Sequence, residues 1–188
     1  MKSKKRLKIT TGKLQLEEPP VFFLDRTFGR IELAAMLRSK NFQLVTIYEE
    51  YGEAESKIAD PVIIYDCGLK NRVLLTGDQD LVYTWAKEIV ESGIAVFVTT
   101  DNNESPKQWG PRIIRAKSDM LRELRRREKP FTARISTEGR VTQVRIHDGA
   151  QWKAITIGKK NPPHVNKQKE AIADSSSLKI KPEHKDET

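Results

Sequence analysis

The sequence predicts an α/β fold, with a mainly parallel sheet flanked by helices. Four short apolar runs of the buried-strand kind alternate with segments whose apolar residues recur at helical spacing. Such alternation is typical of parallel sheets, because a helix has to return the chain to the side where the next strand begins. The chain has 188 residues, of which 37% are hydrophobic and 32% are charged. That balance indicates one domain of ordinary size with polar extensions.

Four strands are expected in the first part of the chain. They are the runs VFFLD at 21–25, FQLVTIY at 42–48, VLLTGD at 73–78 and AVFVTTD at 95–101. Their β-branched and aromatic residues favour strands, and their near-continuous apolar character predicts burial on both faces of the sheet.

Four helices are expected between and after these strands, at 30–40, 60–70, 81–93 and 112–129. Asp60 is expected to be the N-cap of the second helix, with Pro61 at its first position. Gly93 is expected to end the third helix. The acidic stretch 49–56 is expected to form a loop or lid.

The chain is expected to have four parts. They are a basic N-terminal arm at 1–19, the α/β domain at 20–130, a small β meander extension at 131–158 and a polar, disordered tail at 159–188. The meander is expected because FTARIS, TQVRI and KAITI are short alternating segments around glycine-containing turns. The tail has too few apolar residues to form a core.

The basic start of the chain has no apolar stretch after its lysines, and no run approaches the length of a membrane span. We therefore expect a cytoplasmic protein without membrane contact. The single cysteine, Cys67, excludes an intrachain disulfide and a cysteine-based zinc site.

The net charge of +8 is unevenly distributed. It is +4 over residues 1–20, −6 over 21–105 and +10 over 106–188. An acidic centre between basic flanks fits a metal-dependent enzyme that acts on a polyanion, because carboxylates hold cations while lysines and arginines hold phosphates. A solvated surface with basic tails would have the same distribution.

Three of the four predicted strands end in an aspartate, namely Asp25, Asp78 and Asp101. The carboxyl ends of parallel strands meet at one rim of the sheet, where α/β proteins place their sites. Asp60 is expected at the same rim. Carboxylates that converge repel one another, and a divalent cation removes the conflict. Oxygen ligands favour Mg²⁺ or Mn²⁺ over zinc.

The aspartates also have a structural interpretation, since Asp is common as a helix cap after a strand. Capping is the expected role of Asp80 and an alternative for Asp60. The strand at 42–48 runs instead into two glutamates, Glu49 and Glu50.

Two segments, FFLDRTFGRIELAAMLRSKNFQLVT and DPVIIYDCGLKNRVLLTGDQDLV, resemble PIN-like nucleases. The likeness is to the short branch related to bacterial toxin-type ribonucleases. It rests on an LDRxxGR start, an Asp before an apolar helix and an LLTxD strand, and it covers about residues 21–103. It implies a PIN-like three-layer sandwich that hydrolyses RNA phosphodiester bonds with Mg²⁺ or Mn²⁺.

The resemblance also implies roles for particular residues. The metal-binding and water-activating acids would be Asp25, Asp60, Asp78 and, as a fourth member, Asp101 or Asp80. Thr76 would orient the site by hydrogen bonding. The second acid stays open, because the wider family often has Glu there and Glu49, Glu50 and Glu53 compete with Asp60.

The candidate RNA contacts are the arginines Arg26, Arg30, Arg122, Arg125 and Arg126. The first two lie beside the first acid, and the others belong to the helix at 112–129. Arginines hold the RNA backbone without reading its sequence, but they also pair with carboxylates or form a solvated helix face. A toxin-type ribonuclease would have an antitoxin protein as partner, and a homodimer is left open.

Two other functions fit the same sequence. The first is a catalytically inactive PIN-like module that binds RNA or a protein and keeps its acids as caps. The second is a Toprim-type phosphotransfer domain, because GDQD offers an acidic pair after a strand. That family expects a glutamate on the first strand, where this chain has Asp25.

Overall fold

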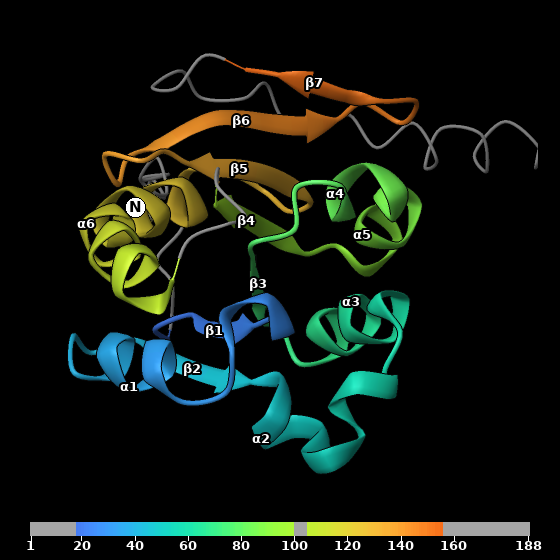
Figure 1. Ribbon diagram of the computed structural model, residues 1–188. Helices are drawn as coiled ribbons and strands as arrows, with labels where there is room; N and C mark the ends of the chain where they lie inside the picture. Colours follow the sequence, from blue (N-terminus) through green and yellow to red (C-terminus); the bar gives the residue numbers. More distant parts are fainter. Residues whose placement is uncertain (1–17, 100–104, 156–188) are drawn as a thin grey trace, which may run out of the picture.

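A seven-stranded sheet organises the chain (Figure 1). The computed structural model describes residues 18–99 and 105–155, so Asp101, most of the predicted arm and the whole of the predicted tail lie outside the described residues. The strands are β1 (Val21–Leu24), β2 (Gln43–Thr46), β3 (Val73–Thr76), β4 (Ala95–Thr99), β5 (Phe131–Ile135), β6 (Val141–His147) and β7 (Trp152–Ala154). The helices are α1 (Glu32–Arg38), α2 (Ile47–Tyr51), α3 (Asp60–Leu69), α4 (Leu81–Thr84), α5 (Ala86–Ser92) and α6 (Pro106–Arg126), with 3-10 turns η1 (Arg26–Phe28) and η2 (Gly52–Lys57).

The strand order is β2-β1-β3-β4-β5-β6-β7. The first five of these strands pair in parallel, whereas β6 pairs antiparallel with β5 and β7 antiparallel with β6. The predicted α/β class, with a mainly parallel sheet flanked by helices, is therefore confirmed. The segment predicted as a meander supplies β5, β6 and β7, which continue the same sheet.

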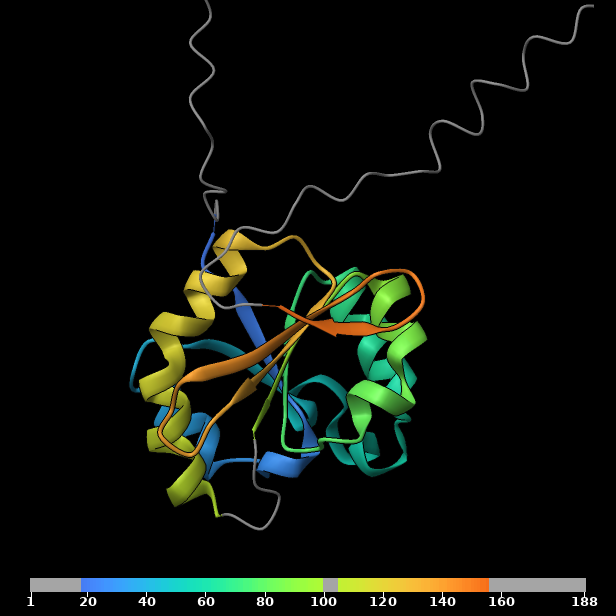
Figure 2. The same cartoon turned by 90° about the horizontal axis from the view of Figure 1, so that it is seen from above.

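Helices cover both faces of the sheet (Figures 1 and 2). Alternate strand residues point to opposite faces, as a strand requires. Phe22 and Leu24 enter the core under α1 and α6, while Phe23 enters the core under α2 to α5. The near-continuous apolar runs of the sequence thus correspond to strands that are buried on both sides. No helix among the described residues has the length and apolar character needed to cross a membrane.

The acidic stretch predicted as a loop is helical, so that prediction was wrong. A capping box begins α2: the Thr46 hydroxyl accepts the Glu49 N–H at 3.1 Å, and the Glu49 carboxylate accepts the Thr46 N–H at 2.8 Å. The reciprocal bonds satisfy two backbone donors that a helix start leaves unpaired. The segment continues through η2, so the acidic residues lie on short helices.

Three features of the helices also differ from the predictions. The helix expected at 81–93 is divided at Trp85, where the backbone leaves the helical region at φ −113 and ψ 32. The last helix begins six residues early, because Ser105 and Gln108 form a second capping box ahead of Pro106. Asp60 is not the N-cap of α3: Ala59 is, and Asp60 lies in the first turn without a capping bond.

Candidate functional site

Asp25 leaves β1 at the carboxyl edge, the rim at which the parallel strands end. Its N–H donates to the carbonyl of Leu75 at 3.1 Å, which continues the pairing of β1 with β3 by one residue. This register places Asp25 beside Thr76, whose hydroxyl donates to Asp25 Oδ2 at 2.8 Å. The hydrogen bond implied for Thr76 is thus present in the structure.

The Asp25 carboxyl is buried, with 3% of the residue exposed. Oδ1 accepts the Arg26 N–H at 2.6 Å and caps η1. Burial raises the pKa of Asp25 above its ordinary value, and the negative charge of Asp60 raises this pKa further. The hydrogen bonds from Thr76 and Arg26 lower the pKa, but by less than burial raises it. Asp25 therefore combines a structural cap with the environment of a perturbed acid.

Arg26 lies between Asp25 and Asp60. Its Nη2 donates to Asp60 Oδ1 at 3.3 Å, and its Nε is 3.8 Å from Asp25 Oδ1. Nη2 also donates to the carbonyl of Ile58. The start of α3 and the end of β1 are joined through this one guanidinium, which makes Asp60 the acid that neighbours Asp25.

The glutamates that compete as second acid bond to cations elsewhere. Glu49 pairs with Arg38, Glu50 pairs with Lys70 and Arg72, and Glu53 and Glu55 both pair with Arg30. None of these pairs involves Arg26, so the geometry favours Asp60 over Glu49, Glu50 and Glu53 as a partner of Asp25.

Asp78 follows β3 by two residues and lies in the turn that leads into α4. Its Oδ1 accepts N–H groups from Asp80 at 2.8 Å and from Leu81 at 3.4 Å, while its own N–H donates to Thr76 Oγ1 at 3.0 Å. The side chain of Asp80 makes no capping bond to α4. Asp80 thus occupies the predicted N-cap position of α4, while the carboxylate that accepts the backbone N–H groups there belongs to Asp78.

A small pocket of about 170 Å³ opens beside these groups and is lined by Thr27, Gly77, Asp78 and Trp109. Thr27 accepts the Gly77 N–H at 2.9 Å and lies 3.4 Å from Asp25 Oδ2. Trp109 is buried against Phe28, with their ring centroids 4.9 Å apart. Trp109 therefore packs in the core as well as lining the pocket.

The gathering of buried threonine side chains at this edge was not predicted from the sequence. Thr46, Thr76 and Thr99 each end a parallel strand and are buried. Among the described residues the Thr99 hydroxyl has no hydrogen-bond partner, and it lies 3.7 Å from the position that a Cβ on Gly77 would take. The signal in the sequence that could have predicted this cluster is the threonine near the end of three predicted strands.

The described acids do not form a complete metal site. Within 18–99 and 105–155, no three His, Cys, Asp or Glu side chains come together as ligands. Arg26 stands between Asp25 and Asp60, and one oxygen of Asp78 is bonded to backbone N–H groups. In this arrangement the three acids do not converge as ligands, so a cation would need Arg26 to release Asp60, and the predicted fourth acid, Asp101, is outside the described part.

The arginines predicted to contact RNA are at two distant places. Arg30 donates to Glu55 at 2.5 Å and stacks over Tyr48, near the acids. Arg122 pairs with Asp119 at 2.6 Å, and Arg125 lines a second pocket, of about 310 Å³, with residues at the amino ends of β1 and β2.

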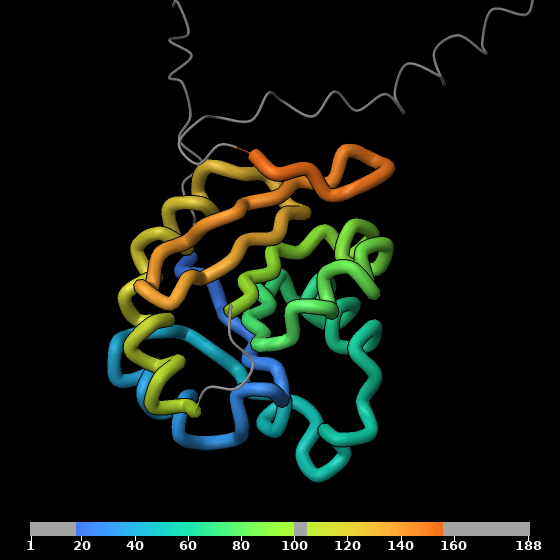
Figure 3. Tube along the Cα trace, turned by 45° about the horizontal axis from the view of Figure 1, so that its top comes forward, coloured from blue at the N-terminus to red at the C-terminus, as the bar shows by residue number. Residues whose placement is uncertain are grey.

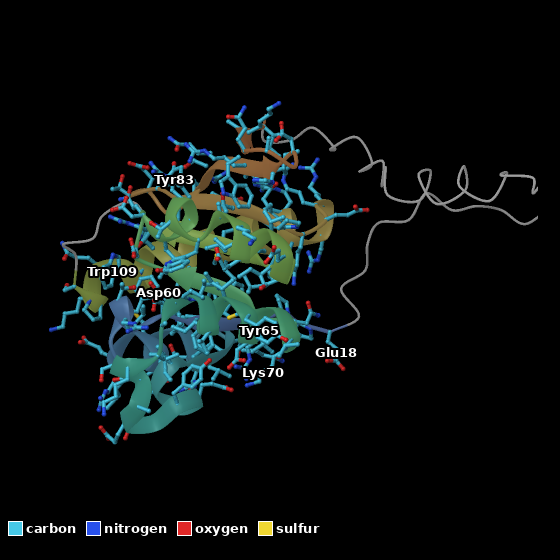
Figure 4. The ribbon with its side chains drawn as sticks, turned by 90° about the vertical axis from the view of Figure 1, so that its right-hand side faces the viewer. Glu18, Asp60, Tyr65, Lys70, Tyr83 and Trp109 are labelled. Carbon is cyan, nitrogen blue, oxygen red and sulfur yellow. The ribbon has the colours of Figure 1, made fainter. Side chains whose placement is uncertain are left out.

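The helix α6 runs along one face of the sheet from one end of the strands to the other (Figure 3). At a rise of about 1.5 Å per residue, Arg125 is about 24 Å along it from Trp109. Arg126, the last residue of α6, is a further residue away. In Figure 4, Asp60 and Trp109 lie toward one end of the molecule and Glu18, which also lines the second pocket, toward the other.

No family model, no curated protein and no solved structure matches this chain.

Proposed function

We propose that the carboxyl edge is the active site of a PIN-like ribonuclease that requires Mg²⁺ or Mn²⁺. The observation that carries the proposal is the buried carboxyl of Asp25, held by Thr76 and neighboured by Asp60 at the end of a parallel sheet. Burial of an acid costs free energy, and perturbed acids at this rim of α/β folds are candidates for catalysis.

Each residue has a defined part in the proposal. Asp25, Asp60 and Asp78 would hold the cation, with Asp101 as the fourth acid, and the bound ion would activate water and neutralise charge on the phosphate. Thr76 fixes the rotamer of Asp25 through its 2.8 Å bond and also accepts the Asp78 N–H, so it links two of the acids.

The proposal requires Arg26 to release Asp60. Their bond is long, at 3.3 Å, and about a third of each side chain is exposed to solvent. Ion pairs of that exposure contribute at most about 1 kcal/mol. A doubly charged ion that binds two carboxylates at once can exceed such a contribution, and the released Arg26 would lie where it can pair with a phosphate.

A second candidate is a non-catalytic module that binds RNA or a protein. The position of Arg26 specifically favours it, because a guanidinium between two carboxylates already reduces their repulsion without a metal. In this alternative, Asp25 and Asp78 act only as caps, the roles in which both make backbone bonds.

Cleavage of a labelled single-stranded RNA distinguishes the two functions. The proposal expects cleavage in Mn²⁺, none in excess EDTA, and a loss of about 100-fold or more in Asp25→Asn and Asp78→Asn, the scale of lost acid–base groups. Glu91→Gln, an exposed acid on α5, is the matched control and should cleave normally. Circular dichroism should show that all three variants are folded.

Absence of cleavage by the folded wild-type chain would favour the non-catalytic module. Equal cleavage by wild type and Asp25→Asn, or cleavage that persists in EDTA, would contradict the proposed active site.

A further inference from the structure

We propose that the outer strands of the sheet, β5 to β7, bind single-stranded RNA on the face that α2 to α5 leave uncovered. This surface, called the basic face below, consists of Tyr83 of α4, Arg134 of β5, and Arg145 and His147 of β6. The inference rests on the proposed function for its ligand, and it adds the direction in which the RNA leaves the acids.

The register of the sheet places the two arginines on one face. Residues that pair directly across neighbouring strands point to the same side of a sheet. Val98 pairs with Arg134, while Val96 pairs with Thr132, which in turn pairs with Arg145. Val96 and Val98 lie in the core under α2 to α5. The arginines therefore continue that same face of the sheet beyond the helices that cover it.

This face changes character between β4 and β5. Among the described residues, the apolar cluster under α2 to α5 takes no buried residue from β5 or β6. The side chains of the basic face are half-buried or exposed, and Ala154, which pairs with Arg145 and so shares its face, is exposed. A sheet with antiparallel strands can leave one side to the solvent. The basic face is thus open to a ligand from outside.

The outer strands carry an excess of positive charge. Between residues 131 and 154 there are four cations, Arg134, Arg140, Arg145 and Lys153, against two carboxylates, Glu138 and Asp148. The helix α4 has no charged residue, and α5 carries Lys87, Glu88 and Glu91. The positive charge near the basic face therefore comes from the strands.

The two arginines of the basic face are not neutralised by these carboxylates. Asp148 lies in the turn after β6 and pairs with Lys153 at 2.5 Å. Arg145 instead donates to the hydroxyl of Tyr83, with its guanidinium 5.5 Å from the centroid of that ring. Within residues 18–99 and 105–155, Arg134 makes no ion pair. Both guanidinium groups are available to the phosphates of a polyanion.

An exposed aromatic ring accompanies the cations. Tyr83 is 50% exposed and is one of five large hydrophobic residues exposed in the described part of the chain. Its helix is fixed to the outer strands, because Trp152 Nε1 donates to the carbonyl of Val82 at 3.0 Å. Bases of single-stranded RNA stack on aromatic rings and on arginine planes. Cations with a fixed, exposed ring favour RNA over an acidic protein, which needs only the cations.

The basic face adjoins the acids of the carboxyl edge. Thr76, Val98 and Arg134 form one row across β3, β4 and β5. At about 4.8 Å between strands, Arg134 is about 10 Å from Thr76, which binds Asp25. Figure 4 shows Tyr83 toward the same end of the molecule as Asp60. One RNA strand can therefore lie at the acids and on the basic face together.

Fluorescence anisotropy of a labelled, unstructured RNA in EDTA measures binding without cleavage. The Arg134→Gln/Arg145→Gln double variant should lower the slope of log affinity against log salt by about 1.4, because each phosphate contact of a single strand contributes about 0.7. Tyr83→Ala should weaken binding about fivefold or more, the scale of one lost stacking contact, and Tyr83→Phe should retain most of it. Arg115→Gln is the matched control, since Arg115 is exposed on α6, across the sheet.

Three results would overturn the proposal when circular dichroism shows the variants to be folded. The first is equal affinity of the wild type and the double variant. The second is an equal loss of affinity in Arg115→Gln, which would show a general effect of charge. The third is displacement of the RNA by poly-glutamate at the same concentration of charges, which would assign the basic face to an acidic protein.

Cleavage kinetics separate this inference from the proposed active site. In Mn²⁺, Arg134→Gln should raise KM and leave kcat unchanged, because a contact outside the reacting groups is equally strong in the ground and transition states. An unchanged KM in this variant would overturn the basic face and leave the active site standing. Wild-type RNA binding that Arg134→Gln weakens, without cleavage by either chain, would support the basic face and contradict the active site.

Discussion

Asp25 is a carboxyl group whose surroundings oppose its charge. Removal from water raises its pKa more than the hydrogen bonds of Thr76 and Arg26 lower it. The folded chain therefore binds the proton of Asp25 more tightly than the unfolded chain, whose reference pKa is 3.8. Below that reference value the resulting stability is fully present, and it is lost as the pH rises through the folded pKa.

This sign gives the first prediction. In EDTA, Asp25→Asn should gain stability relative to the wild type as the pH rises from about 3 to about 7, because the neutral amide has no charge to desolvate. Urea unfolding at a series of pH values measures the difference in free energy of unfolding. Glu91→Gln on the exposed face of α5 serves as control and should show no such trend. Wild-type and Asp25→Asn curves that stay parallel across the range would contradict the raised pKa.

At the scale of elements, short polar signals decide where helices begin. Thr46 ends β2 and caps α2 within one residue, so the chain turns from strand to helix without a loop. Replacement by alanine removes the acceptor of the Glu49 N–H, and we expect a loss of about 1 to 2 kcal/mol in the free energy of unfolding. Thr46→Ser keeps the hydroxyl and should recover most of it. Denaturant unfolding checks both, and equal losses in the two variants would exclude the cap as the cause.

The packing of α3 on α5 depends on Gly68. A Cβ at this position would lie 2.7 Å from the backbone oxygen of Ser92, which cannot move without shifting α5. Alanine has the higher helix propensity by about 1 kcal/mol, but overpacking against backbone costs about 1 to 3 kcal/mol. We expect Gly68→Ala to lower the melting temperature; an unchanged or higher value would show that the two helices separate freely.

The strands and layers of the whole molecule could be predicted because burial on both faces leaves a local signature. The predicted runs VFFLD, VLLTGD and AVFVTTD supply β1, β3 and, in their described part, β4 of the parallel sheet. The helices in the acidic stretch after β2 could not be predicted from its polar composition, because a polar segment can form a helix as readily as a loop once a capping box is present. Asp80 is the N-cap residue of α4 as predicted, but the side-chain bonds at this helix start come from Asp78, which depends on a turn geometry that the two-residue spacing does not fix.

The candidate site could be predicted only in part. Strand-end aspartates located Asp25 beside Thr76, since parallel register brings successive strand ends together. The position of Arg26 between Asp25 and Asp60 depends on a contact across 34 residues and has no local signal. The distance of Arg125 from the acids likewise follows from the length of α6 rather than from its composition.

That separation has a consequence for the whole molecule. The acids lie at one end of the strands, and the basic end of α6 lies at the other. An RNA that contacts both Asp25 and Arg125 must extend along α6, whereas a short oligonucleotide at the acids would contact only Arg26 and Arg30. Because contacts with phosphates are ionic, the affinity for RNA would depend on the salt concentration.

Binding of Mn²⁺ to the carboxyl edge tests the central claim most directly. Thermal unfolding of the metal-free chain should shift upward as Mn²⁺ is added, with about 2.7 kcal/mol of stabilisation at a hundredfold excess over the dissociation constant. Asp25→Asn and Asp78→Asn should lose this shift, and Glu91→Gln should retain it. No shift in the wild type, or the same shift in all four chains, would show that these acids do not hold a cation.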